Sequence, residues 1–303
     1  MRKTTAALSA LALSTIVLTG CSAAAPTFEG AACERDSSAA LERSVTVSGD
    51  FGSPRVTIEL PVHTGKAAYA DIITGDGRAI VDGRQEAILA RVLMNGTTGQ
   101  VLDAQLKLWS PDSAGAELAG VDEALRCATE GSRIVASIPA AELPEGAAQQ
   151  IGLDAKDSLV AVYDVRYTAL PKADGADVFN DAPGLPSVVR APDGRPGVIV
   201  PDTAAPKKAI TETLLQGEHE KVGKGTALIR STSVGWTSRS VGQTTWDSTL
   251  TGTDGLPAEV TEAVSASRVG SQLMVIVPAE SGDDATVYVV DVLGVIPAEL
   301  MAR

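Results

Sequence analysis

Apolar and polar positions alternate through most of the chain, which predicts short strands separated by turns. Val56 to Leu60 is one such segment, and Pro61 closes it. Asn95-Gly96, between two apolar segments, is a strong hairpin-turn signal. Helical spacing occurs in two short segments, around Leu118 to Cys127 and Ala258 to Ala266. The pattern therefore predicts many strands and few helices.

The predicted elements recur in the two halves of the chain. Glu123-Ala124-Leu125 in the first half has its counterpart, Glu262-Ala263-Val264, 139 residues later. The same offset relates Gly131-Ser132 to Gly270-Ser271. We interpret the halves as duplicated domains. In each half the helix is followed by a predicted strand and then by a last strand: Ser132 to Ile138 and Leu159 to Val165, or Ser271 to Val277 and Thr286 to Val292.

This order of elements predicts an α+β fold in which each half forms a curled antiparallel sheet around a short helix. Residues 22–43 are rich in Ala, Ser and Glu without clear periodicity, which is typical of a tether. Residues 172–185 have the Asp, Ala, Gly and Pro content of an exposed linker. The predicted divisions are a leader at 1–20, a tether at 21–45, a first domain at 46–171, the linker at 172–185 and a second domain at 186–303.

The N-terminus has the features of an export signal. Arg2 and Lys3 precede an apolar stretch from Ala6 to Leu18, which is well short of the roughly 20 residues that span a bilayer. Leu18-Thr19-Gly20-Cys21 resembles the lipobox of bacterial lipoproteins, which implies cleavage before Cys21 and lipidation of its thiol. We expect a protein outside the cytoplasm, anchored to the outer face of the cell membrane. The alternative is an ordinary secretory leader with an incidental cysteine.

Two further cysteines, Cys33 and Cys127, follow the leader. An exported chain with two remaining thiols most economically pairs them, so we expect a Cys33–Cys127 disulfide. The loop that it closes has about 95 residues, which corresponds to roughly 4 to 5 kcal/mol in the chain-entropy model. The alternative is two buried free thiols.

Charge and residue content exclude several classes of function. The chain has 25 Lys plus Arg against 38 Asp plus Glu, a net charge of -13, so neither a phosphate backbone nor an anionic lipid surface attracts it. We therefore expect no nucleic-acid partner. Its two histidines, His63 and His219, belong to no zinc-binding pattern, and no nucleotide-binding or hydrolase motif occurs. We expect neither a metal nor a cofactor.

The segment Gln216 to Val295 resembles an FKBP-type peptidyl-prolyl cis-trans isomerase domain, and the first half resembles it more weakly. The most specific motif is Val269-Gly270-Ser271 followed by apolar residues and Pro278. The rest of the resemblance lies in Val222-Gly223-Lys224-Gly225, in Ser240 to Trp246 and in the closing Val289 to Leu293. It implies a tandem FKBP-like protein that acts on exported polypeptides with Xaa-Pro bonds and uses no cofactor.

The physical basis of such catalysis is a dry aromatic cleft that holds the proline ring and stabilises the twisted amide, whose rotation otherwise costs about 18–20 kcal/mol. Most of the implied aromatic positions are replaced in this chain. By the resemblance, Ser231 stands at the Tyr position, Gly242-Gln243 at the Phe-Asp pair, Val260 at the helix Trp and Val290 at the closing-strand Phe. The proline-pocket candidates in the second half are therefore Trp236, Trp246, Val260 and Tyr288.

Two functional hypotheses follow from these residues. The first is an FKBP-like lipoprotein that assists the folding of exported proteins by Xaa-Pro isomerisation. The second is a non-catalytic chaperone or scaffold that keeps the fold without the aromatic pocket. A solute-binding lipoprotein would suit the anchor, but antiparallel repeats do not suggest a doubly wound clamshell.

Overall fold

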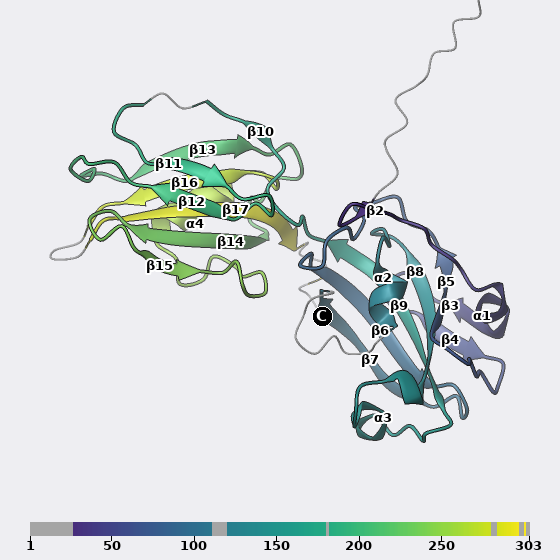
Figure 1. The fold of residues 1–303 in the computed structure, drawn as a ribbon. Helices are drawn as coiled ribbons and strands as arrows, with labels where there is room; N and C mark the ends of the chain where they lie inside the picture. The colour runs from purple at the N-terminus through teal and green to yellow at the C-terminus, as the bar shows by residue number, and fades with distance from the viewer. Residues whose placement is uncertain (1–26, 111–119, 180–181, 280–283, 297–299, 301–303) are drawn as a thin grey trace, which may run out of the picture.

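The structure is a computed structural model, and it describes residues 27–110, 120–179, 182–279, 284–296 and 300. The chain is mostly β-structure with few, short helices, and each half contains one large antiparallel sheet (Figure 1). Within these ranges, no helix has the length and apolar character needed to cross a membrane.

The sheet of the first half has five antiparallel strands in the order β5-β8-β9-β6-β7. Its central strand β9 is fully buried along most of its length, which is why apolar residues occupy both faces there. The strands are β5 (Ala68–Ile73), β6 (Ala87–Asn95), β7 (Val101–Trp109), β8 (Arg133–Pro139) and β9 (Ser158–Thr168).

The sheet of the second half has the order β10-β13-β16-β17-β14-β15. Apart from the edge strand β10, this is the order of the first sheet, strand for strand. A register shift between Ile88 and Leu89 in β6 recurs between Leu228 and Ile229 in β14. The two halves therefore share their strand order and this β-bulge. The strands are β10 (Ala176–Asp177), β13 (Ile210–Gln216), β14 (Thr226–Gly235), β15 (Val241–Thr244), β16 (Gln272–Val277) and β17 (Thr286–Ile296).

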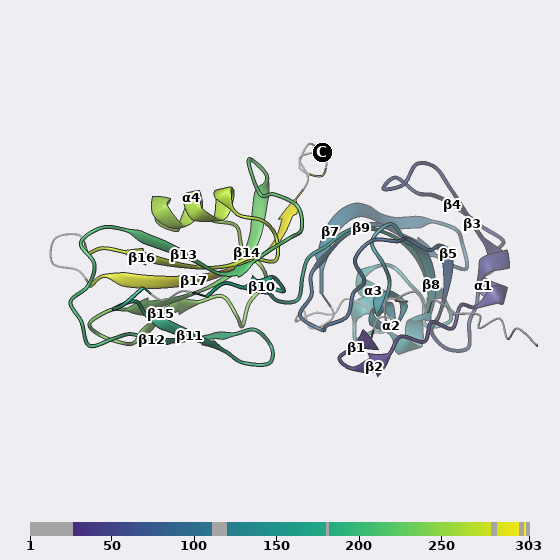
Figure 2. The same cartoon turned by 90° about the horizontal axis from the view of Figure 1, so that it is seen from above.

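A helix covers one face of each sheet (Figure 2). The second-half helix α4 (Ala258–Ala266) has the predicted bounds. The first-half helix α2 (Val121–Leu125) is shorter than predicted, because Gly120 before it and Cys127 after it have left-handed backbone conformations, with φ of 92° and 60°. The first half also contains a 3₁₀ turn at Ala140–Glu142 and α3 (Ala147–Gln150).

A two-stranded hairpin covers the opposite face of each sheet. In the first half, β3 (Val45–Ser48) and β4 (Arg55–Ile58) pack on Val92, Val160 and Val162. In the second half, β11 (Ser187–Arg190) and β12 (Pro196–Ile199) pack on Met274, Ile276 and Val287. Each half thus consists of a hairpin, a sheet and a helix.

The tether predicted at 21–45 differs from the structure over its described part. Residues 27–45 contain β1 (Thr27–Phe28), β2 (Ala31–Ala32) and α1 (Ala39–Ser44), and they lie against the first sheet. Leu41 is buried there, and the Ser38 N–H donates to the Tyr69 carbonyl in β5. The predicted linker at 172–185 likewise contains β10, which extends the second sheet. Local composition did not indicate either segment, because their strand pairing and packing depend on partners that are distant in the sequence.

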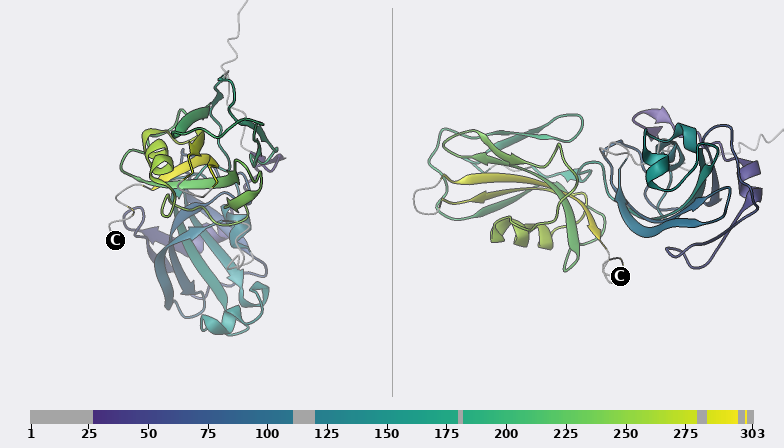
Figure 3. Two further views of the ribbon diagram at one scale, coloured as in Figure 1. Left: turned by 90° about the vertical axis from the view of Figure 1, so that its left-hand side faces the viewer. Right: turned by 90° about the horizontal axis from the view of Figure 1, so that it is seen from below.

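The two halves lie side by side and share one apolar cluster (Figure 3). Ile88, Tyr167 and Leu170 of the first half belong to the same cluster as Leu228 and Val260 of the second. The core under α4 is therefore completed by the first half.

Candidate functional site

Trp236 and Val260 lie on opposite faces of the second sheet. Trp236 follows β14 and packs with Val200 and Val234 on the hairpin face, where its indole N–H donates to the Thr203 carbonyl at 2.9 Å. Val260 is on the α4 face, and its side chain is fully buried. One proline ring cannot contact both residues.

The α4 face holds two further implied pocket positions, Val290 and Tyr288, at a packed core. Val290 in β17 is fully buried in the same cluster as Val260, and Tyr288 packs against that cluster. Burial raises the pKa of the Tyr288 hydroxyl. The small side chains of Val260 and Val290 let α4 pack closely on the sheet. The helix and these side chains then fill the space that aromatic rings would otherwise line.

Trp246 lies at the junction with the first half. Its side chain is 1% exposed, and the Arg230 guanidinium lies 5.5 Å from its ring centroid. Arg230 Nη1 donates to the Trp246 carbonyl at 3.3 Å, and Nη2 donates to the carbonyl of Arg84 in the first half at 3.1 Å. Arg230, which packs against Trp246, therefore joins the second half to the first.

A buried carboxylate of the first half, Glu86, adds to this junction. Its side chain accepts a hydrogen bond from the Leu250 N–H of the second half, and the residue is 2% exposed. Burial raises the pKa of Glu86, and nearby Arg230 partly offsets that rise. Among the described residues, four buried polar atoms around this contact have no hydrogen-bond partner: Glu86 Oε2, Thr168 Oγ1, Arg230 Nε and Trp246 Nε1. Sequence analysis missed this cluster, and the one available signal was charged Arg230 inside an apolar strand.

Thr244 and Thr245, within the segment Ser240 to Trp246 that carries part of the resemblance, use their hydroxyls to join strands. Thr244 Oγ1 lies 3.0 Å from Thr232 Oγ1, and Thr245 Oγ1 accepts the Ser231 N–H at 2.9 Å. These bonds connect β15 and the residue after it to β14. These hydroxyl groups therefore have a structural role in the sheet.

The two equivalent closing-strand aspartates, Asp164 and Asp291, have different partners. Asp164 forms a buried ion pair with Arg133, with Nε–Oδ1 at 2.6 Å, and accepts the Gly52 N–H of the β3–β4 turn. At the position of Arg133 the second half has Gln272, whose side-chain amide donates to Asp291 at 2.7 Å. Asp291 has no direct ion pair among the described residues, so burial raises its pKa to about 6.

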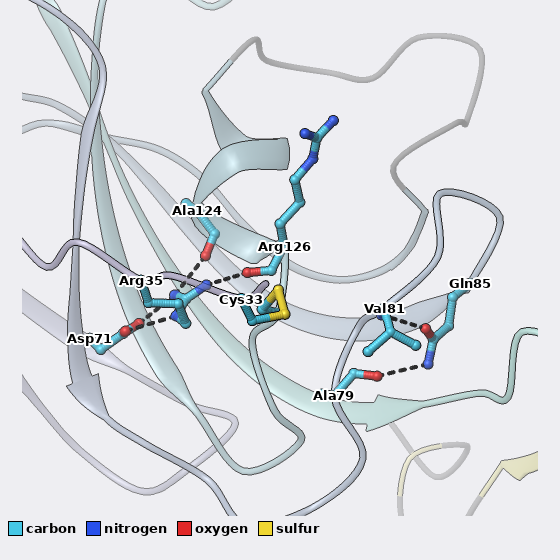
Figure 4. Close-up of a disulfide and its surroundings, with 9 residues drawn as sticks. Cys33, Arg35, Asp71, Ala79, Val81, Gln85, Ala124 and Arg126 are labelled. Carbon is cyan, nitrogen blue, oxygen red and sulfur yellow. Dashed lines mark hydrogen bonds and ion pairs between the residues drawn. A yellow bond between two sulfur atoms is a disulfide. The ribbon is translucent and has the colours of Figure 1, made fainter. Parts of the chain in front are cut away.

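The disulfide lies on the N-terminal side of the first half (Figure 4). Cys33 and Cys127 are bonded with a Cα–Cα distance of 5.7 Å, the pairing expected from the sequence. Arg35 beside it pairs with Asp71 and donates to the Ala124 carbonyl at 2.8 Å. These contacts fix the N-terminal segment to the end of α2. Cys21, the predicted lipidation site, lies outside the described residues.

None of the four pocket candidates lines a described cavity. Four of the cavities on the described surface have volumes between 340 and 630 Å³. They lie beside the disulfide, between the β3–β4 hairpin and strands β6 and β7, between the two halves, and beside β11. Across the described residues, no group of three His, Cys, Asp or Glu side chains is placed to hold a metal ion. A proline-binding role for Trp236, Trp246, Val260 and Tyr288 stays a prediction.

Comparison with known proteins gives matches among solved structures. No family model matches the chain, and no curated protein matches it. The three FKBP domains of wheat FKBP73 match with a TM-score of 0.34 and 13% identity, covering 77% of this chain and 95% of that one. FkpA from Escherichia coli matches with a TM-score of 0.27 and 17% identity, covering 34% of this chain and 47% of that one. A putative peptidyl-prolyl cis-trans isomerase, FKBP12 from Mycobacterium tuberculosis, matches with a TM-score of 0.27 and 21% identity, covering 34% of this chain and 85% of that one. The solved structures to which the chain is similar are FKBP-type peptidyl-prolyl isomerases, the family that its sequence motifs resemble.

Proposed function

We propose that this chain is an FKBP-like lipoprotein that binds exported polypeptides outside the cytoplasm without catalysing Xaa-Pro isomerisation. One observation carries the proposal. Val260 and Val290, at the positions where the resemblance implies pocket aromatics, are both fully buried in a packed core. Isomerisation of this type needs an apolar cleft that stays open to a proline ring, because stabilisation of the twisted amide requires contact with it.

Export and anchoring are the second part of the proposal. Its support is the leader ending in Leu18-Thr19-Gly20-Cys21 and the disulfide between Cys33 and Cys127, since structural disulfides persist in oxidising compartments. Multiple acyl chains on Cys21 would hold the protein stably at the membrane. Mass spectrometry of the protein from its native membrane tests this part: a diacylated or triacylated Cys21 supports it, and an unmodified, secreted chain contradicts it.

Polypeptide binding is tested with a secreted protein that is unfolded and then diluted in the presence of the purified chain. We expect the chain to suppress aggregation at stoichiometric concentration and to leave the rate of proline-limited refolding unchanged. Equal aggregation with and without the chain would contradict the binding role.

Isomerase activity is the second candidate, and the Val269-Gly270-Ser271 to Pro278 motif favours it. In that case the cleft would have to form beside Trp246, by separation of the two halves. Trp246→Ala should then abolish turnover, and full activity in that variant would exclude Trp246 from the site.

A further inference from the structure

A cavity of about 630 Å³ lies between the two halves, apart from the four proline-pocket candidates. We call it the junction pocket. This volume is in the range of small-molecule sites. It is lined from the first half by Arg78, Glu130 and Tyr167, and from the second half by Glu220, Lys221, Lys224, Gly225, Val295 and Ile296.

The inner part of the junction pocket is fixed by hydrogen bonds between the halves. Tyr167, at the end of β9, is 5% exposed, and its hydroxyl donates to Glu220 Oε1 at 3.1 Å and accepts the Val295 N–H at 2.8 Å. Burial raises the pKa of Tyr167 to about 12, so the hydroxyl stays protonated at neutral pH. The Tyr167 ring, Val295 and Ile296 thus form a pre-formed wall with apolar surface.

The acidic groups of the pocket already have internal partners. Glu130 accepts the Thr168 N–H at 2.9 Å, and Glu220 Oε2 lies 3.8 Å from Arg78 Nη2. Arg78 also donates to the Thr168 carbonyl. Both carboxylates and the guanidinium therefore already interact with other groups of the protein.

The two lysines at the pocket differ from these groups. Lys221 and Lys224, between β13 and β14, are exposed, and their ammonium groups have no hydrogen-bond or ion-pair partner among the described residues. In a chain of net charge -13, two unpaired cations beside an apolar wall are complementary to an anionic group with an apolar body.

We propose that the junction pocket binds a carboxylate carried on a short aliphatic body. Lys221 and Lys224 receive the carboxylate, and the aliphatic part lies along Tyr167, Val295 and Ile296. Two sources have this chemistry: a free medium-chain fatty acid, and the carboxyl terminus of a polypeptide that ends in aliphatic residues. Binding at this pocket does not depend on the function proposed above.

Octanoate is the first probe, added to the isotopically labelled protein while amide resonances are followed by NMR. Saturable shifts are expected at residues 221–225 and at Val295. Octanol and octylammonium should bind at least about tenfold more weakly, because neither can form charge-assisted hydrogen bonds with the lysine ammonium groups as a carboxylate does. Octanoate shifts that do not saturate, or equal binding of octanol, would overturn the proposal.

The variant test compares two pairs of exposed lysines. Lys221→Gln with Lys224→Gln should weaken octanoate binding about tenfold or more. The matched pair Lys207→Gln with Lys208→Gln, outside the pocket, should leave it within about twofold. Equal effects of both pairs would show general charge attraction and overturn the site.

The source of the ligand is distinguished with the peptide acetyl-Ala-Ala-Val-Leu, with a free or an amidated carboxyl terminus. Tighter binding of the free acid than of octanoate points to polypeptide termini, and the reverse points to fatty acids; both results support the site. Equal binding of the amide and the free acid would contradict recognition of a carboxylate.

Discussion

At the residue scale, the side chain beside the buried closing-strand aspartate differs in charge between the two halves. Arg133 neutralises buried Asp164, whereas its counterpart Gln272 only donates a hydrogen bond to buried Asp291. In the second half the guanidinium lies on the hairpin instead, since Arg190 Nε donates to Gln272 Oε1 at 2.7 Å. The duplicated aspartates were visible in the sequence. Their different ionisation was not, because it depends on which side chain faces each carboxylate across the sheet.

This difference predicts that Asp291→Asn stabilises the protein at neutral pH. The folded pKa of Asp291, about 6, lies above its ordinary value of 3.8, so its contribution to stability falls as pH rises from about 4 to 6 and stays low above that. The two values differ by about 2 units, or about 3 kcal/mol. The variant should therefore have a larger free energy of unfolding than the native chain at pH 7.5, by up to that amount, and a similar one at pH 4.

Asp164→Asn is the matched control, measured by the same denaturant unfolding. It leaves the Arg133 guanidinium, whose side chain is 4% exposed, without its carboxylate, and should cost about 3–5 kcal/mol. A pH-independent effect of Asp291→Asn, or a loss of stability in both variants at pH 7.5, would contradict this account.

At the element scale, the pattern of the chain predicted the last two strands of each half, β8 and β9 or β16 and β17, and the bounds of α4, because these elements have clear periodicity. It missed both hairpins as a repeated element. Val188 and Val198 of the β11–β12 hairpin face the sheet, while Val189 and Ile199 are exposed, so apolar residues occupy both faces and no alternation identifies the buried one. The candidate site was limited in the same way: the missing aromatics were evident, but the closure of the space by α4 was not.

The packing of α4 predicts that an aromatic residue cannot be restored at Val260. Because this side chain is fully buried, Val260→Trp overpacks the core and should lower the free energy of unfolding by about 1–3 kcal/mol or more, without producing isomerase activity. Glu262→Trp on the exposed side of α4 is the control and should change stability by less than about 0.5 kcal/mol. A Val260→Trp variant of native stability would show that the cleft is open.

At the scale of the whole molecule, the shared cluster and the junction hydrogen bonds make the halves one cooperative unit. Leu170→Ala removes a buried side chain that packs with the second half, and should cost about 2–5 kcal/mol. We expect one unfolding transition, seen alike by NMR amide resonances of the first half and of the second half, with both midpoints lowered by the substitution. Two separate transitions, of which Leu170→Ala moves only one, would show that the halves unfold independently.

The most direct test of the central claim is NMR exchange spectroscopy of a short Xaa-Pro peptide at high protein concentration, with near-UV circular dichroism showing that the protein is folded. The closed core around Val260 and Val290 predicts that cis-trans exchange keeps its uncatalysed rate, with a time constant of roughly tens to hundreds of seconds at 25 °C. Acceleration in proportion to protein concentration, lost in Trp246→Ala, would contradict the account and establish an isomerase.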